Sequence, residues 1–264
     1  DHSSIYATTD LSTIIQRQKD YQPDKIWYVV DKRQSLHFEQ VFRCARLAEL
    51  VPKVTDLEFL GFGTMNGSDG KPYKTRDGGV MRLSDLLKTV VSAAEEKLSK
   101  SEFVMDSDRE DTANKVGMAG VNFGDLINHR SKDYIFDLDK FLSFEGKTGT
   151  YILYTVTRIN SILKKTGEAK PDFAIADDAA RELALSLILS GEAFAAAHSE
   201  KAPNYICESV YRIATAFSRF YHDNHILNEQ DEQKKKAWIS LIMLTKKIIV
   251  KHLDVLGIET VDAM

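Results

Sequence analysis

The amino-acid sequence predicts a partial α/β half followed by an all-α helical bundle. Strand-like and helix-like runs alternate over the first hundred residues, an order that is typical of a parallel α/β sheet. From about residue 106 onward, only periodic helical segments follow one another. We therefore expect two domains, one over residues 1–105 and one over residues 106–264.

The α/β half contains two strand-like runs, at residues 26–31 and 56–63. Helical periodicity predicts helices over residues 37–50 and 82–98. Two strands are too few for a complete doubly wound domain, so this half is interpreted as the second part of one. We expect its sheet edge and uncovered apolar faces to favour association.

The second half shows five helical segments separated by residues that begin or end helices. Gly146, Gly167, Pro171 and Pro203 stand in the breaks. The predicted helices cover residues 108–129, 148–166, 173–197, 202–227 and 232–256.

The composition excludes several classes of protein. The chain has 264 residues, 43% of them hydrophobic, and a net charge of −4, so it is neither mainly disordered nor a strongly basic nucleic-acid binder. No apolar run approaches the ~18 residues that suggest a membrane span, so we expect no membrane partner. Two cysteines, Cys44 and Cys207, are too few for a disulfide framework or a zinc site. We expect a cytoplasmic protein without a metal site.

A glycine-rich loop is the most informative stretch of the sequence. Six of the 14 glycines fall within residues 61–79, close to Lys71, Lys74 and Arg76. Exposed backbone N–H groups beside cations favour an anionic partner such as a polyphosphate, although a plain surface hairpin has the same composition. A Walker phosphate loop is a poor match, because Pro72, not Ser or Thr, follows the Gly-Lys pair and the spacing of the leading glycine is wrong.

Other candidates are weak when taken singly. Tyr6 and Asp10 are four residues apart and share a helix face. His37 follows a strand end, where α/β sheets bind ligands, but a single histidine there is more often a capping or packing residue than a catalytic one. Tyr151, Tyr154 and Arg158 share a predicted helix, either as core residues or as a surface on which bases stack.

Together, these residues lie in long runs that resemble one family, the arginyl-tRNA synthetases. Their catalytic domain, of the class I nucleotide-binding type, resembles YATTDLSTIIQR, YVVDKRQSLHFEQVF and GFGTMNGSDGKPYKTRDGGVMRLSDLL. The start of their helical anticodon-binding domain is similar to DYIFDLDKFLSFEGKTGTYILYTVTRINSILKK, and their C-terminal end is similar to HLDVLGIETVDAM. The resemblance runs from about residue 3 to residue 264.

The resemblance implies roles for individual residues. It implies that Tyr6, Asp10 and Gln34 bind the side chain of the substrate arginine. The carboxylate of Asp10 suits this role, because a carboxylate accepts two guanidinium N–H groups side by side. It implies that the nucleotide is bound by His37, Phe62, Gly63, Thr64 and Met65. It implies that Lys71, Lys74 and Arg76 are the catalytic cations, because they stand where class I synthetases carry the Lys-Met-Ser-Lys-Ser signature. This sequence departs from the signature at Thr75, which aligns with its second lysine. It implies that the tRNA anticodon is contacted by Tyr151, Tyr154, Arg158, Tyr221 and Met264.

The implied activity is ATP-dependent ligation of L-arginine to tRNA(Arg). ATP and Mg²⁺ enter as a substrate complex, and no tightly bound cofactor is expected. The class I His-Ile-Gly-His signature is absent from these 264 residues, so we expect a C-terminal portion that is inactive alone. The alternative is a non-catalytic tRNA-binding module. A third reading is a helical interaction protein with a vestigial nucleotide half.

Overall fold

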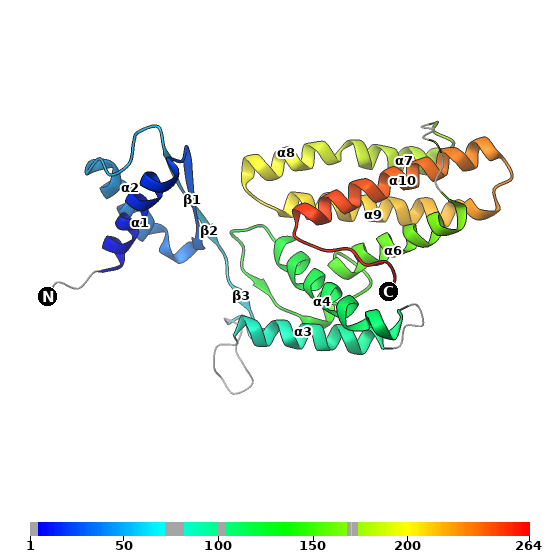
Figure 1. The fold of residues 1–264 in the computed structure, drawn as a ribbon, viewed down its shortest axis with the longest axis horizontal. Coiled ribbons are helices and arrows are strands. Elements are labelled where there is room, and N and C mark those ends of the chain that lie inside the picture. The colour runs from blue at the N-terminus through cyan, green and yellow to red at the C-terminus, as the bar shows by residue number, and fades with distance from the viewer. Residues whose placement is uncertain (1–4, 72–81, 100–103, 168–169, 171–173) are drawn as a thin grey trace. The chain divides into compact units, whose positions relative to one another are not determined.

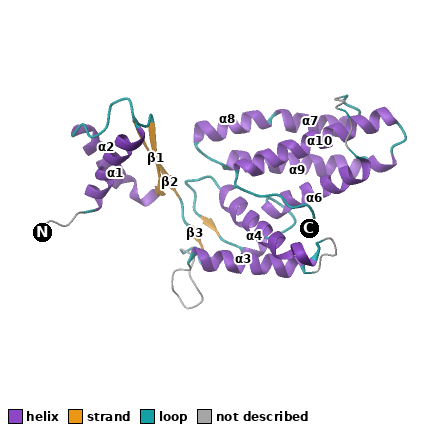
Figure 2. Cartoon of the chain, in the orientation of Figure 1, coloured by secondary structure: helices purple, strands orange, loops and turns teal. Residues whose placement is uncertain are grey.

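The computed structural model describes residues 5–71, 82–99, 104–167, 170 and 174–264. Contacts divide the chain into two compact units. The first comprises Asp1–Met65 with Arg130–Tyr134, and the second comprises Asn66–His129 with Ile135–Met264. The first unit holds a parallel strand pair and its helices, and the second is helical, so the predicted fold class is confirmed (Figures 1 and 2).

The first unit is built around two parallel strands. Lys25 pairs with Asp56 at their amino ends, and Asp31 pairs with Phe62 at their carboxyl ends. Parallel strands need a crossover connection, and a helix between the two strands supplies it here. The elements in order are α1 (Tyr6–Tyr21), β1 (Lys25–Asp31), the 3-10 turn η1 (Lys32–Gln34), α2 (Ser35–Leu47) and β2 (Asp56–Phe62).

Among the described residues of this unit, only one face of β1 is covered. Ile26 and Tyr28 are buried in a core with Ile14 of α1 and with α2, whose Phe38 ring lies 4.9 Å from that of Tyr28. On the other face of the strand, Trp27 is 47% exposed and Val29 is 58% exposed. Parallel sheets are normally covered on both faces. The predicted uncovered apolar surface of this half is therefore present on β1.

The second unit is made of helices whose ends follow from local sequence signals. Thr148 caps α6 by accepting a hydrogen bond from the Tyr151 N–H, and Gly167 ends it with a φ of 72°. The helices are α3 (Leu83–Leu98), α4 (Arg109–Leu126), α5 (Leu138–Phe141), α6 (Gly149–Thr166), α7 (Asp178–Ile188), α8 (Ser190–Glu200), α9 (Asn204–Asp223) and α10 (Glu232–Val255). The remaining short elements of the described chain are β3 (Met65–Asn66), which pairs with β4 (Tyr134–Ile135), and the 3-10 turns η2 (Asp106–Asp108) and η3 (Ile226–Asn228).

One predicted helix is wrong in its extent. The pattern over residues 173–197 suggests a single helix, whereas the structure has α7 and α8 with a break at Leu189. At the break, the Ser190 hydroxyl donates to the Leu187 carbonyl at 2.6 Å. The start of α7 is set by Asp177, which accepts from the Ala180 N–H at 2.8 Å. No helix in the described ranges is both long and apolar enough to cross a bilayer.

Candidate functional site

Asp10 and His37 meet at the carboxyl end of β1. Asp10 lies on α1, and His37 is the third residue of α2, which follows β1 and η1 directly. The His37 Nε2 atom is 2.6 Å from the Asp10 Oδ2 atom, and the two side chains are 30% and 24% exposed. The contact uses Oδ2, so a guanidinium that takes both carboxylate oxygens must share that atom with His37. A residue predicted to bind arginine thus touches one predicted to bind the nucleotide.

Tyr6 and Gln34 are less enclosed. Tyr6 is the first residue of α1, one turn before Asp10, and it is 86% exposed. Gln34 ends η1 and is also exposed. Their roles toward arginine stay predictions.

The turn after β1 is fixed by an ion pair that the sequence analysis does not single out. The Asp31 carboxylate accepts hydrogen bonds from the Arg33 backbone N–H at 2.8 Å and from the Arg33 guanidinium Nη2 at 2.5 Å. These bonds lower the pKa of Asp31 to about 2, so it is ionised at neutral pH. The pair sets the path of the chain from β1 to Gln34 and His37. An acid at a strand end followed two residues later by a cation is the signal for it.

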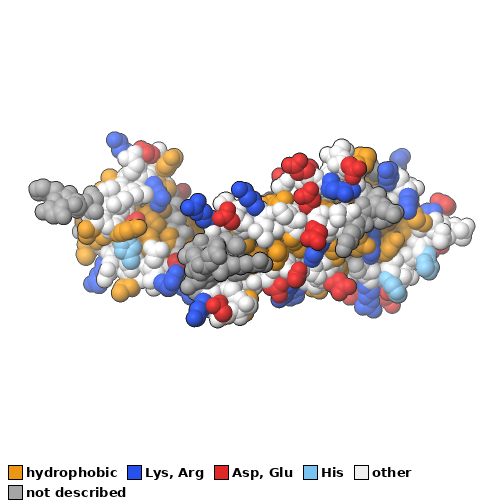
Figure 3. All heavy atoms as spheres, turned by 90° about the horizontal axis from the view of Figure 1, so that it is seen from below, with side chains coloured by type: hydrophobic (Ala, Val, Ile, Leu, Met, Phe, Trp, Pro, Cys, Tyr) orange, Lys and Arg blue, Asp and Glu red, His pale blue; other side chains and the backbone are white. Residues whose placement is uncertain are grey.

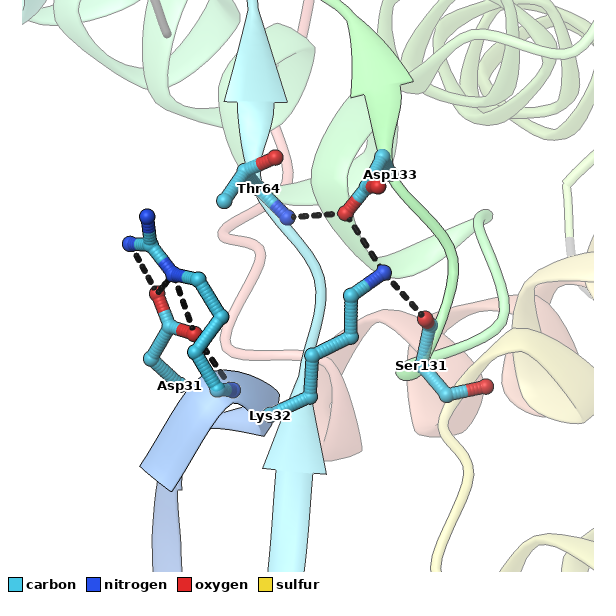
Figure 4. A network of polar contacts seen from close by, with 6 residues as sticks. Asp31, Lys32, Thr64, Ser131 and Asp133 are labelled. Carbon is cyan, nitrogen blue, oxygen red and sulfur yellow. Dashed lines mark hydrogen bonds and ion pairs between the residues drawn. The ribbon is translucent and has the colours of Figure 1, made fainter. Parts of the chain in front are cut away.

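The segment predicted to face adenine follows β2. Phe62, its last residue, is 40% exposed, and Gly63, Thr64 and Met65 come directly after it. Thr64 donates its backbone N–H to the Asp133 carboxylate at 2.7 Å, and Lys32 donates to the same oxygen at 2.8 Å (Figure 4). Sequence reasoning misses Lys32 and Asp133, because Asp133 is 69 residues away from Thr64 and no local pattern connects them.

The glycine-rich loop is described only in part. Residues 67–71 form a turn in which the Gly67 N–H donates to the Lys71 carbonyl at 2.7 Å and the Lys71 N–H donates to Asp69 at 3.0 Å. The Lys71 side chain is exposed. Lys74 and Arg76 lie outside the described residues. Within the described ranges, no group of three or more His, Cys, Asp or Glu residues is placed to hold a metal ion.

In the helical unit, one arginine joins two of the predicted anticodon residues. The Arg158 guanidinium lies 4.7 Å from the centroid of the Tyr154 ring on α6 and 5.2 Å from that of the Tyr221 ring on α9. Its Nη2 also donates to the Tyr154 hydroxyl at 2.7 Å. Stacking of this kind favours a guanidinium over an ammonium. We call these three residues the Tyr154–Arg158–Tyr221 cluster.

Tyr151 and Met264 are placed differently. The Tyr151 hydroxyl donates to Ser218 of α9 at 3.2 Å, and its ring lies 5.8 Å from that of Tyr211. Tyr151 therefore helps to pack α6 against α9. Met264 is buried at the end of the C-terminal tail, which α4 holds through Asn122, the donor to the Gly257 carbonyl. The anticodon role of both residues stays a prediction.

Charge on the helical unit is mixed. On the face drawn in Figure 3, Lys and Arg side chains are interspersed with Asp and Glu side chains. Lys147 pairs with Glu208 at 2.7 Å, and Arg219 pairs with Glu182 at 2.9 Å. Any contact with nucleic acid must therefore rest on particular residues, as the low net charge predicts.

Comparison with known proteins assigns both parts of the chain. Residues 1–138 match the catalytic-domain family of class I (R) tRNA synthetases, and residues 152–264 match the DALR anticodon-binding domain family. This chain belongs to the arginyl-tRNA synthetase family. The predicted family is confirmed, with a partial catalytic domain before the helical domain.

Relatives of the same family span this chain from end to end. The arginine–tRNA ligase of Alkaliphilus oremlandii is 48% identical over 271 residues, covering 100% of this chain and 46% of the relative. That of Agathobacter rectalis is 47% identical and covers 100% of this chain and 47% of the relative. The chain thus spans about half the length of the curated relatives that it matches.

Solved arginyl-tRNA synthetases share the fold. The Thermus thermophilus enzyme superposes with a TM-score of 0.82 at 22% identity, over 99% of this chain and 50% of the other. The Plasmodium falciparum enzyme superposes with a TM-score of 0.80 at 22% identity, over 98% of this chain and 44% of the other.

Proposed function

We propose that this chain supplies the nucleotide-facing and anticodon-facing portion of an arginine–tRNA ligase. The reaction joins arginine to AMP from ATP, releasing pyrophosphate, and then transfers the arginyl group to the terminal ribose of tRNA(Arg), releasing AMP. Mg²⁺ enters with ATP as part of the substrate complex. The proposal includes a cytoplasmic location, in keeping with the free thiols of Cys44 and Cys207.

The contact between Asp10 and His37 carries the proposal. The family resemblance assigns Asp10 to arginine and His37 to the nucleotide, two substrates that must lie side by side for an adenylate to form. The 2.6 Å distance between their side chains supports one shared site at the carboxyl end of β1. The exposed apolar face at Trp27 and Val29 supports a catalytic domain that needs further elements beside this sheet.

A second candidate is a tRNA-binding module without catalysis. It is favoured by the helical unit, where the anticodon-domain match covers residues 152–264 and the Tyr154–Arg158–Tyr221 cluster offers aromatic and cationic surface. In this case the helices would bind tRNA while the α/β unit played no chemical part.

The experiment uses a replacement chimera. This chain takes the place of the matching region in the Alkaliphilus oremlandii ligase, to which it is 48% identical. We expect the chimera to support arginine-dependent pyrophosphate exchange and to charge tRNA(Arg). We expect the 264-residue chain by itself to bind tRNA(Arg) without catalysing exchange.

The outcomes separate the two candidates. An inactive chimera, together with tRNA binding by this chain, favours the non-catalytic module. Arginine-dependent exchange by this chain alone would overturn the view that it needs the remaining half of the catalytic domain.

A further inference from the structure

A short segment between α4 and β4 is fastened to the end of β2. The Arg130 guanidinium donates to the Gly61 carbonyl at 2.7 Å, and the Gly63 N–H donates to the Arg130 carbonyl at 2.9 Å. Farther along, the Tyr134 N–H donates to the Thr64 carbonyl at 3.0 Å. We call residues 130–134 the clasp. It bonds to Gly61, Gly63 and Thr64, in and next to the predicted adenine-facing segment, so an independent movement of that segment would break these bonds.

Close approach makes the fit of the clasp specific. A Cβ atom added at Gly63 would lie 2.2 Å from the Lys132 carbonyl oxygen and 2.8 Å from the Asp133 backbone nitrogen. No side chain other than hydrogen leaves room for the two backbones here. The glycine in Phe-Gly-Thr-Met is therefore required by the clasp, whatever its role toward a ligand.

Asp133 ties the clasp to both strands. Its Oδ1 atom accepts from the Thr64 N–H, which follows β2, and from the Lys32 ammonium, which follows β1 (Figure 4). The Lys32 ammonium also donates to the Ser131 carbonyl at 3.3 Å. The bonds from Lys32 and Thr64 hold the pKa of Asp133 below its usual range, so the carboxylate stays charged at neutral pH. Charge-assisted bonds of this type are short and strong.

We propose that Asp133 is a positioning residue for ATP. Its carboxylate holds the Thr64 backbone and the Lys32 ammonium, so that residues 62–65 have the conformation that binds the nucleotide before the nucleotide arrives. The inference rests on the proposed function and adds a role for residues 130–134 to it. The N–H groups of Gly63 and Thr64 are already used by Arg130 and Asp133. Adenine must then be read by other groups of the segment, and the clasp sets where those groups stand.

The first test uses amide hydrogen exchange on the 264-residue chain. Asp133→Ala should speed exchange of the Thr64 amide by about tenfold or more, because its acceptor is lost. The matched control is Asp56→Ala, which removes a carboxylate from the Lys25–Asp56 pair (2.9 Å) at the opposite end of the same strands. Unchanged exchange at Thr64 in Asp133→Ala would overturn the proposal.

The second test uses the chimera in pyrophosphate exchange. Asp133→Ala should raise the KM for ATP by about tenfold while the KM for arginine and kcat change less, and Asp56→Ala should leave all three unchanged. The double variant Lys32→Asp with Asp133→Lys restores an ion pair but cannot accept from the Thr64 N–H. We expect it to remain impaired for ATP.

Each outcome bears on one proposal. If the double variant Lys32→Asp with Asp133→Lys recovers the wild-type KM for ATP, the Thr64 contact has no positioning role. The ion pair between residues 32 and 133 would then be sufficient. An unchanged ATP KM in Asp133→Ala would overturn positioning while the ligase function stood. If the unsubstituted chimera forms no adenylate, the ligase function fails, and the role of Asp133 in it fails as well.

Discussion

The Asp10 carboxylate and the His37 imidazole lie 2.6 Å apart, joining α1 to the start of α2. If Asp10 binds arginine and His37 binds the nucleotide, as the resemblance predicts, the recognition of arginine and of ATP should be coupled through this contact. A site built to pair a guanidinium rejects a ligand that lacks it by about 10⁴-fold or more. The identity of the Asp10 side chain is thus expected to influence both substrates.

In the chimera, Asp10→Asn should raise the KM for arginine about 10- to 100-fold and should also raise the KM for ATP, because the amide loses the charge that both partners face. Gln34→Ala is the matched comparison and should affect arginine alone. The measurement is pyrophosphate exchange with each substrate varied. Combining Asp10→Asn with His37→Gln should give a smaller effect than the sum of the two single changes. Wild-type arginine kinetics in Asp10→Asn would contradict the assignment.

The loop cations should act on the reaction more than on binding. Replacing Lys71, Lys74 or Arg76 singly by Ala should depress adenylate formation more than ATP affinity, because the predicted role of these cations is to stabilise charge that develops on the leaving pyrophosphate. Single-turnover rates and equilibrium ATP binding in the chimera separate the two quantities. Lys88→Ala, an exposed lysine on α3, should change neither. Equal losses in rate and binding would indicate simple nucleotide capture.

Arg158 should matter for anticodon recognition through its shape as well as its charge. Arg158→Lys keeps the charge but loses the flat guanidinium between Tyr154 and Tyr221, so we expect about a tenfold weaker complex with tRNA(Arg). A binding titration of this chain at two salt concentrations, with the normal and an altered middle anticodon base, measures it. Arg219→Lys, on α9 and paired with Glu182, is the control. An unchanged affinity of Arg158→Lys for tRNA(Arg) would indicate that only the charge of Arg158 contributes to binding.

The exposed face of β1 should drive association of this chain when it is purified alone. Val29→Lys should weaken self-association by about tenfold, since it places a charge on the uncovered apolar face beside Trp27. Sedimentation velocity over a range of protein concentrations checks this. Ile188→Lys on α7, where the residue is 73% exposed, provides the control. If both variants associate as the parent chain does, the face is not the site of contact.

His252 should make the helical unit sensitive to acid. Its Nδ1 donates to the Ile248 carbonyl and its Nε2 accepts from Ser209. Burial, with a smaller effect of the Arg212 charge, lowers its pKa, so the folded state favours the neutral ring. The unfolded chain takes up a proton at about pH 6.5, so stability is full above that pH and falls below it.

The test is the melting temperature between pH 5 and pH 8. His252→Asn should reduce the fall in melting temperature on acidification, while His222→Gln, whose side chain is 88% exposed, should retain it. An identical fall in both variants would contradict the assignment to His252.

Local sequence determined the fold class and most of the elements. The limits of α6 follow from Thr148 and Gly167, and β1 follows from a short apolar run. The link between Tyr154 and Arg158 spans four residues on one helix, a spacing that sequence alone makes neighbours. Hydrophobic periodicity does not reveal the break between α7 and α8 at Leu189.

Tertiary structure alone decided which distant residues meet. Asp10 and His37 are 27 residues apart, and Thr64 and Asp133 are 69 residues apart. Tyr221 reaches Arg158 only because α6 and α9 pack together. Helical periodicity and caps act over a few residues, so they define elements and their faces. Contacts between elements depend on how the whole core packs, and the sequence pattern of either partner does not contain that information.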